Sequence, residues 1–288
     1  MSDTRTRFRE RPGKANFNHI YDRETPRDYY VQLTEHDYQL PNHVQSAFGR
    51  LVEERARRDG RPPRIFDVAC SYGVNAALLK YDVTFAGLAE RYRRDDLRHM
   101  SVDELIEADR AYFAERARPD APRVYGCDVA GNAVRYGERT GLLDRGWGVN
   151  LEEEMPDEAL RECLARVDVV TVSAAIGYLT RRTIERIFTH IPEERRPWFA
   201  AFSLRTAPID DVAHALHDHG LELGTLTGRT VRQRRFVNHD EESSAIRRVS
   251  ERGYVVDDHE SDGYWHAALY IGMPQADAPL NMVHLLDS

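Results

Sequence analysis

The chain has 288 residues, of which 41% are hydrophobic and 31% charged, and its formal net charge is −8. This composition is typical of a globular protein with one large domain, or one domain plus an appendage, and not of a disordered chain. The negative charge argues against an extended nucleic-acid-binding face, and no apolar run reaches the roughly 18 residues that cross a membrane.

The targeting and cysteine patterns favour a cytoplasmic protein without a structural metal. The polar start MSDTRTRFRERPGK lacks the apolar core of a secretory signal. Cys70, Cys127 and Cys163 are odd in number and not in CxxC spacing, so they form neither a disulfide framework nor a zinc site. We therefore expect no metal.

Residues 1–60 are expected to form a polar tail followed by a helical cap. Residues 15–41 are rich in Tyr, Asn and His, and an amphipathic helix is predicted from Asn42 to Arg58. Its apolar positions recur at helical spacing. Gly60 with two prolines close behind it ends the segment.

From residue 61 onward, strand and helix patterns alternate. Strands are predicted at residues 64–69, 123–129, 147–151, 168–173, 198–204, 221–228, 234–238 and 264–272. Helices are predicted at 74–81, 130–141, 156–167, 180–191 and 207–220. The alternation predicts an α/β fold, a doubly wound, Rossmann-like and mostly parallel sheet with an antiparallel C-terminal strand. The domain would span 61–275, with a short tail at 276–288.

The stretch FDVACSYGVNAALLK, residues 66–80, joins the first strand to the first helix of this domain. In a doubly wound sheet, a ligand lies beyond such a loop, where glycine allows close approach. Asp67 ends the strand, and Ala69, Ser71 and Gly73 occupy the alternating positions where glycines are expected. Small residues tolerate a close ligand, but this loop is poorly suited to holding a pyrophosphate.

Asp128 lies at the end of the second predicted strand, the position at which a carboxylate holds a ribose diol. It lies 55 residues after Gly73, because 128 − 73 = 55, whereas the usual offset is about 20. The excess, at about residues 82–122, is predicted to be a helical insertion. It could act as a lid over the ligand or merely extend a layer of helices.

These features together resemble the class I methyltransferase family, whose members bind S-adenosylmethionine. The resemblance covers roughly residues 60–275. It implies that the first loop faces the amino-acid part of the cofactor, that Asp128 holds the ribose and that the third strand ends beside the adenine. The cofactor-binding residues implied in this way are Asp67, Ala69, Cys70, Ser71, Tyr72, Gly73, Asn75, Asp128, Val129, Asn150, Leu151 and Glu152.

The end of the fourth strand, from Ser173 to Tyr178, would face the reacting sulfonium in such a protein. Methyl transfer needs alignment first, and a base only for a protonated nucleophile. Tyr178 could orient a substrate or present its ring to the sulfonium. It could equally cap the strand with its hydroxyl in water.

Three further residues are candidates for the substrate side. Asn18 and Tyr21 could belong to a segment that closes over the site, although packing on the sheet edge explains them equally well. Arg205 follows a buried strand and could bind a carboxylate, or it could form a salt bridge to a helix. The run RQRRF at 232–236 is expected to be a solvated loop.

Three functions remain open on the sequence. The first is methyl transfer to a small-molecule acceptor. The second is intramolecular cyclisation of S-adenosylmethionine with release of methylthioadenosine, as in the azetidine-2-carboxylate synthases of the same fold. The third is a non-catalytic binding protein. The expected partner is a small molecule, or S-adenosylmethionine alone, and the sequence indicates no oligomeric state.

Overall fold

The computed structural model describes residues 13–277 and 282–286, and its centre is an eight-stranded sheet. The strand order is β3-β2-β1-β4-β5-β8-β6, and β7 also pairs with β8. The strands are β1 (Arg64–Val68), β2 (Arg123–Cys127), β3 (Arg145–Trp147), β4 (Val169–Ser173), β5 (Trp198–Leu204), β6 (Leu221–Thr225), β7 (Val231–Arg235) and β8 (Tyr264–Pro274). β1 to β5 are parallel, and β8 is antiparallel to each of its neighbours. This confirms the predicted fold class and puts the switch point between β1 and β4.

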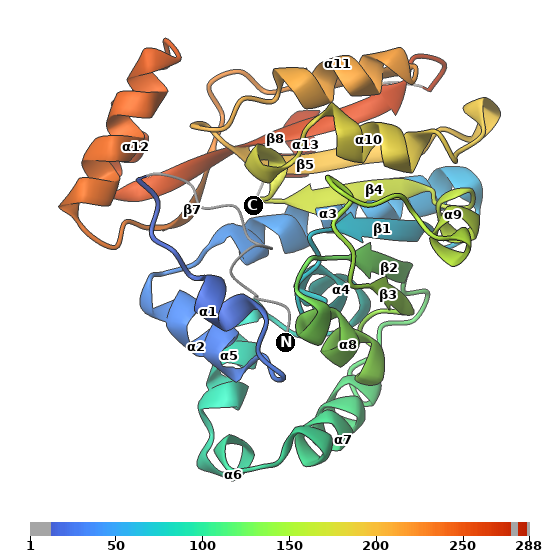
Figure 1. Cartoon of the computed structure of the whole chain (residues 1–288), viewed down its shortest axis with the longest axis vertical. Helices are drawn as coiled ribbons and strands as arrows, with labels where there is room; N and C mark the ends of the chain where they lie inside the picture. Colours follow the sequence, from blue (N-terminus) through green and yellow to red (C-terminus); the bar gives the residue numbers. More distant parts are fainter. Residues whose placement is uncertain (1–12, 278–281, 287–288) are drawn as a thin grey trace.

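Helices cover both faces of the sheet (Figure 1). The α-helices of the described residues are α1 (Asn18–Tyr21), α2 (Arg27–Glu35), α3 (Leu40–Asp59), α4 (Val74–Lys80), α5 (Phe85–Arg93), α6 (Asp95–Arg98), α7 (Val102–Ala114), α8 (Gly131–Arg139), α9 (Glu158–Leu164), α10 (Arg181–Phe188), α11 (Asp210–Asp218), α12 (His239–Glu251) and α13 (Met282–Leu286). None of these helices, in the part of the chain that the structure describes, is long and apolar enough to cross a membrane.

Alternating side chains of the strands build two separate cores. Ile65 belongs to the core under α3 and α4, and the next residue, Phe66, belongs to the core under α9, α10 and α11. All seven residues of β5 are buried. A strand covered on both faces reads as a continuous apolar run, and for this reason residues 198–204 were recognisable from sequence alone.

Two predicted strands were misplaced and some helices were not predicted. The strand expected at 147–151 is wrong, because β3 ends at Trp147 and Asn150 starts a turn. Its Oδ1 accepts the N–H of Glu152 at 3.0 Å, and its carbonyl accepts that of Glu154 at 2.7 Å. β7 begins three residues before the strand expected at 234–238. The helices α1, α2 and α12 were not predicted.

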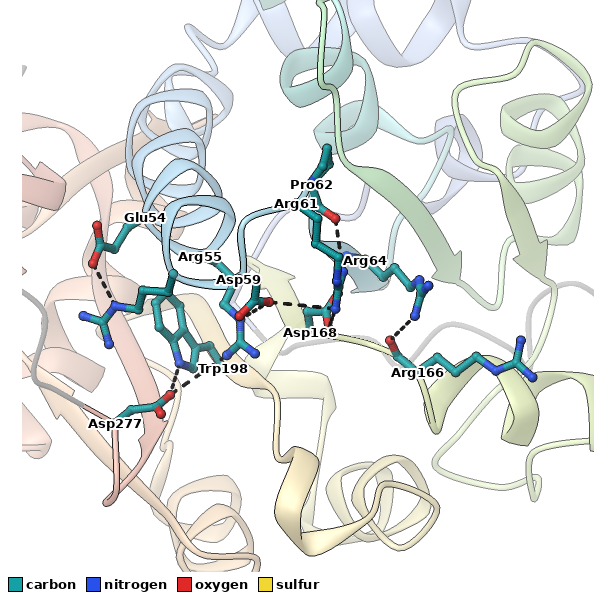
Figure 2. A network of polar contacts seen from close by, with 11 residues as sticks. Glu54, Arg55, Asp59, Arg61, Pro62, Arg64, Arg166, Asp168, Trp198 and Asp277 are labelled. Atoms are coloured by element: carbon teal, nitrogen blue, oxygen red, sulfur yellow. Dashed lines mark hydrogen bonds and ion pairs between the residues drawn. The ribbon is translucent and has the colours of Figure 1, made fainter.

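The amino ends of the central strands are fixed by a polar network away from the predicted ligand edge (Figure 2). Arg61 makes two hydrogen bonds of 2.8 Å to the carboxylate of Asp168, which also accepts the backbone N–H of Arg64 at 2.8 Å. The indole of Trp198 donates to Asp277. The first contacts tie the chain after α3 to the starts of β1 and β4, and the last ties the start of β5 to the segment after β8.

The insertion forms α5, α6 and α7, and it packs on the N-terminal helices. The ring of Tyr30 in α2 stacks on Tyr92 at 5.0 Å and contacts Phe85 at 5.1 Å. The expected N-terminal tail lies mostly outside the described residues, at 1–12. In the expected C-terminal tail, α13 packs against α3, where Arg50 donates to the carbonyl of His284 at 2.8 Å.

Candidate functional site

A cavity of about 620 Å³ lies at the carboxyl ends of β1, β2, β3 and β4. We call the residues from these strand ends its floor (68–71, 127–129, 149–153 and 173–175). Its roof comes from the N-terminal segment (13–18, Tyr21, Tyr29, Leu33, Tyr38, Leu40, Pro41 and Val44), with Gln233 and Arg234 of β7 at one side. In Figure 1, α1 and α2 lie on the side toward which the arrows of β1 and β4 point. The volume lies within the range of about 300–1,000 Å³ that is typical of small-molecule sites.

The loop between β1 and α4 has a strained backbone. Ala69, Ser71 and Gly73, the positions at which glycines were expected, all adopt left-handed φ values of 60°, 50° and 78°. Ala174, at the end of β4, has a φ of 61°. Each non-glycine residue in this region costs roughly 1–2 kcal/mol. Ala69, Ser71 and Ala174 all lie in the floor of the cavity, so the protein tolerates this cost at the place where the shape of the loops matters for binding.

Hydrogen bonds to the end of β2 hold this loop in place. Cys70 N–H donates to the carbonyl of Cys127 at 3.1 Å, and Ser71 N–H donates to Asp128 Oδ2 at 2.8 Å. The other oxygen, Oδ1, accepts the N–H of Ala130 at 2.9 Å. Burial raises the pKa of Asp128, while these N–H donors oppose the rise. The carboxylate thus lines the cavity in a fixed orientation, with accepting capacity left for a ligand.

The close approach of β2 to the loop requires glycine at position 126. A Cβ there would lie 2.7 Å from the sulfur of Cys70 and 3.1 Å from the carbonyl oxygen of Asp67. We therefore expect Gly126→Ala to lower the free energy of unfolding by about 1–3 kcal/mol in denaturant titrations. Gly131→Ala is the matched control, because a Cβ there meets nothing within 4 Å. Equal stability of the two variants would contradict the loop geometry.

Asp67 lies beneath the floor and supports it. Its carboxylate accepts from Thr171 Oγ1 at 2.7 Å and from Asn75 Nδ2 at 3.0 and 3.1 Å, and the same Asn75 nitrogen is 3.0 Å from Ser173 Oγ. Asn75 and Ser173 line the cavity, whereas Asp67 does not. Burial raises the pKa of Asp67 to about 7, against the effect of these hydrogen bonds.

The raised pKa of Asp67 predicts a pH dependence of stability. Between its ordinary value of 3.8 and about 7, the folded protein holds a proton that the unfolded chain has lost. Stability from this group is therefore full below about pH 4 and declines as the pH rises toward 7. We expect Asp67→Asn to flatten the melting temperature against pH in this window, as measured by calorimetry. A slope unchanged from the wild type would show that Asp67 is ionised throughout.

The roof presents tyrosines to the cavity. Tyr21 packs edge-on against Tyr29 at 5.5 Å, and Tyr29 in turn packs against Tyr72 at 5.7 Å. Burial raises the pKa of Tyr21 and of Tyr29, and raises that of Tyr38 to about 12. All three phenols are consequently neutral near pH 7 and can donate or accept hydrogen bonds.

Two contacts fasten the roof to the α/β domain. Tyr72 Oη accepts the N–H of Arg23 at 2.9 Å and lies 3.0 Å from the carbonyl of Ile20. Asp22 Oδ1 accepts the N–H of Asn132 at 2.8 Å. Tyr72, one of the expected cofactor contacts, uses its hydroxyl to hold the end of α1.

Most of the predicted site residues line the cavity, and a few do not. Those that line it are Asn18, Tyr21, Ala69, Cys70, Ser71, Asn75, Asp128, Val129, Asn150, Leu151, Glu152, Ser173 and Tyr178. Gly73, like Asp67 and Tyr72, lies outside the lining, where it precedes α4. Arg205 is also outside. Its guanidinium bonds Glu260 Oε2 and the carbonyl of Val255, both at 2.6 Å, so the salt-bridge alternative is correct.

The residues that sequence reasoning missed lie in the roof and in β7. Tyr38, Leu40, Gln233 and Arg234 line the cavity, although none was a candidate. The expectation that 232–236 is a solvated loop is wrong for its centre, since Arg234 is only 2% exposed. A run of three arginines and a glutamine gives no sign of a buried residue. Arg234 can be buried because it pairs with Glu241, which belongs to the unpredicted helix α12.

Carboxylates dominate the charge of the cavity wall. Glu152 accepts from Thr180 Oγ1 at 2.8 Å and Thr183 Oγ1 at 2.6 Å. Burial pushes its pKa up, but these donors and backbone N–H groups hold it below the ordinary value. Of the lining cations, Arg234 is paired with Glu241 and Lys14 lies over the ring of Trp265 at 5.6 Å. In the described residues, no three His, Cys, Asp or Glu side chains are placed to hold a metal.

The chain matches no protein-family model and no curated protein. Several solved structures resemble it in outline. A plantazolicin methyltransferase in complex with SAH has a TM-score of 0.42 and 7% identity over 86% of this chain and 90% of its own. Magnesium protoporphyrin IX methyltransferase from Synechocystis PCC 6803 has a TM-score of 0.38 and 11% identity over 86% and 95%. Geranyl diphosphate C-methyltransferase from Streptomyces coelicolor A3(2) has a TM-score of 0.39 and 11% identity over 79% of this chain and 75% of its own. Likeness at this level describes a general outline, so any functional assignment must come from the site itself.

Proposed function

We propose that the protein binds S-adenosylmethionine and transfers its methyl group to a small-molecule acceptor. The observation that carries this proposal is the pairing of Asp128 with the strained β1–α4 loop at the switch point of the sheet. Two oxygens fixed by Ser71 and Ala130 suit the two hydroxyls of a ribose. The loop and the ends of β3 and β4 would then surround the rest of the cofactor.

The electrostatics of the cavity favour this cofactor over a dinucleotide. Asp128, Glu152 and Glu153 line the wall, and Arg234 is neutralised by Glu241. A pyrophosphate would meet carboxylates, whereas a sulfonium would be attracted to them. The Cβ atoms of Ala69 and Ser71 also obstruct a close phosphate nest. The roof tyrosines suit a cation, because aromatic faces attract sulfonium and ammonium groups.

The chain itself would contribute orientation and the exclusion of water. The bound cofactor supplies an electrophilic methyl group. Tyr21 lines the cavity from the roof and Tyr178 lines it after the end of β4, and phenols at these places can position an acceptor. The hydrogen bonds of Tyr72 and Asn132 to residues 20–23 hold the roof over the floor. Alignment of this kind provides much of the barrier reduction in a displacement reaction.

A second candidate is intramolecular cyclisation of S-adenosylmethionine with release of methylthioadenosine. The roof favours it, because two hydrogen bonds fasten the chain just after α1 to the α/β domain and tyrosines line the roof. A cofactor folded under such a roof would need no acceptor. The cavity of about 620 Å³ is compatible with either reaction.

Incubation with S-adenosylmethionine alone separates the candidates. The purified protein is mixed with the cofactor, and adenosyl products are followed by mass spectrometry beside a heat-denatured control. Unchanged but bound cofactor supports methyl transfer to an acceptor that is not yet supplied. Methylthioadenosine together with a cyclic amino acid would support cyclisation. No binding in calorimetry would refute both.

A further inference from the structure

A β-bulge places two successive side chains of β7 toward the protein interior. Arg232 pairs with His266 and Arg235 pairs with Tyr264, so β7 has one more residue than β8 between these pairs. The extra residue puts both Gln233 and Arg234 on the buried side, where they are 5% and 2% exposed. Bulges re-aim side chains and are enriched beside functional sites.

The two side chains differ in their hydrogen bonding. Arg234 makes three hydrogen bonds, of 3.0 and 2.6 Å to the two oxygens of Glu241 and of 2.8 Å to the carbonyl of Arg235. Gln233 lines the cavity, and its Oε1 is buried without a partner. Leaving such a polar atom unpaired is costly in a folded protein, which makes Gln233 a candidate for ligand contact.

The backbone fixes Gln233 at the edge of the roof. Its carbonyl accepts the N–H of Gln39 at 2.8 Å, next to the start of α3. The neighbouring lining residues Leu33, Leu40 and Val44 are apolar and at most 2% exposed. This part of the wall therefore combines the unpaired amide oxygen of Gln233 with buried apolar side chains, and the adjacent guanidinium of Arg234 is already paired.

We propose that Gln233 determines specificity by pairing its side-chain amide with a carboxamide-like edge of the acceptor, which carries a donor beside an acceptor atom. This rests on the proposed function, since it names the substrate class of the same site. A terminal amide offers one C=O and one NH₂, and half a turn exchanges their positions. A neutral partner with both groups satisfies it in either orientation. The acceptor is thus a small molecule with an apolar or aromatic body and one such edge.

The test uses three probes of nearly equal shape, benzamide, acetophenone and benzoate. Their binding to the protein, in the presence and in the absence of excess S-adenosylhomocysteine, is measured by ligand-observed NMR. We expect benzamide to bind about tenfold more tightly than the other two, as one additional satisfied buried hydrogen bond implies. In Gln233→Met the difference should fall to about twofold. Gln39→Met, the same change at a residue outside the lining, should keep it.

Equal binding of the three probes to the wild type would overturn the inference, and so would a preference that survives in Gln233→Met. The wild-type comparison stands even where that variant fails to fold, which circular dichroism reveals. Titration of S-adenosylhomocysteine in the same samples separates the two proposals. If it does not bind while the Gln233-dependent preference persists, the cofactor is wrong and the amide subsite stands.

Discussion

Asp128→Ala is expected to weaken S-adenosylmethionine binding by roughly 10- to 150-fold, the equivalent of one hydrogen-bonded charge. The carboxylate is the group best placed to receive a ribose, because its orientation is set by Ser71 N–H and Ala130 N–H. Removing it deletes the ligand contact and also leaves these two donors without their acceptor. Calorimetry at constant pH measures the affinity directly.

Asp157→Ala is the matched control for this variant. Asp157 also accepts a backbone N–H, that of Leu160 at 2.7 Å, but it caps α9 outside the cavity lining. It should lose about 1 kcal/mol of stability and no affinity. If Asp128→Ala binds the cofactor as tightly as Asp157→Ala does, the ribose contact is elsewhere and the proposed function loses its main support.

The floor of the cavity was largely predictable because it depends on local order along the chain. The alternation of Ala69, Ser71 and Gly73 directly after a buried strand is a local feature of the sequence, and the structure gives all three positions a left-handed backbone. Asp128 follows from the same rule applied to the next strand of the sheet. Such positions are set by the strand–turn–helix connection and need no knowledge of distant partners.

The roof was less predictable because its contacts join residues far apart in sequence. Arg234 can be buried only because α12 supplies its partner. This helix was not predicted because its sequence is polar, although Asn238 is an N-cap whose side chain accepts the N–H of Glu241. The bulge at Gln233 exists only relative to β8. The direction of Tyr72 depends on the left-handed turn at Ser71, and the partner of Arg205 lies 55 residues away.

The largest loss of stability is expected for Asp109→Ala, at about 3–5 kcal/mol of unfolding free energy. Asp109 lies in α7 and is 0% exposed. Its Oδ1 accepts from Arg91 Nη2 at 2.8 Å, and its Oδ2 accepts from the hydroxyls of Tyr92 and Tyr136. Alanine would leave a nearly buried guanidinium and two phenols without their shared acceptor. Denaturant titration measures the loss, and a change below 1 kcal/mol would contradict this account.

Asp103→Ala serves as the control, because Asp103 is in the same helix and also pairs with an arginine, but its side chain is 79% exposed. Little change in stability is expected there. The buried cluster also bears on the cavity, since Tyr92 stacks on Tyr30 beside the roof residue Tyr29. Asp109→Ala should therefore weaken cofactor binding although it touches no lining residue. A stability loss with unchanged affinity would show that the insertion is only a structural layer, whereas a joint loss would show that it holds the roof in place.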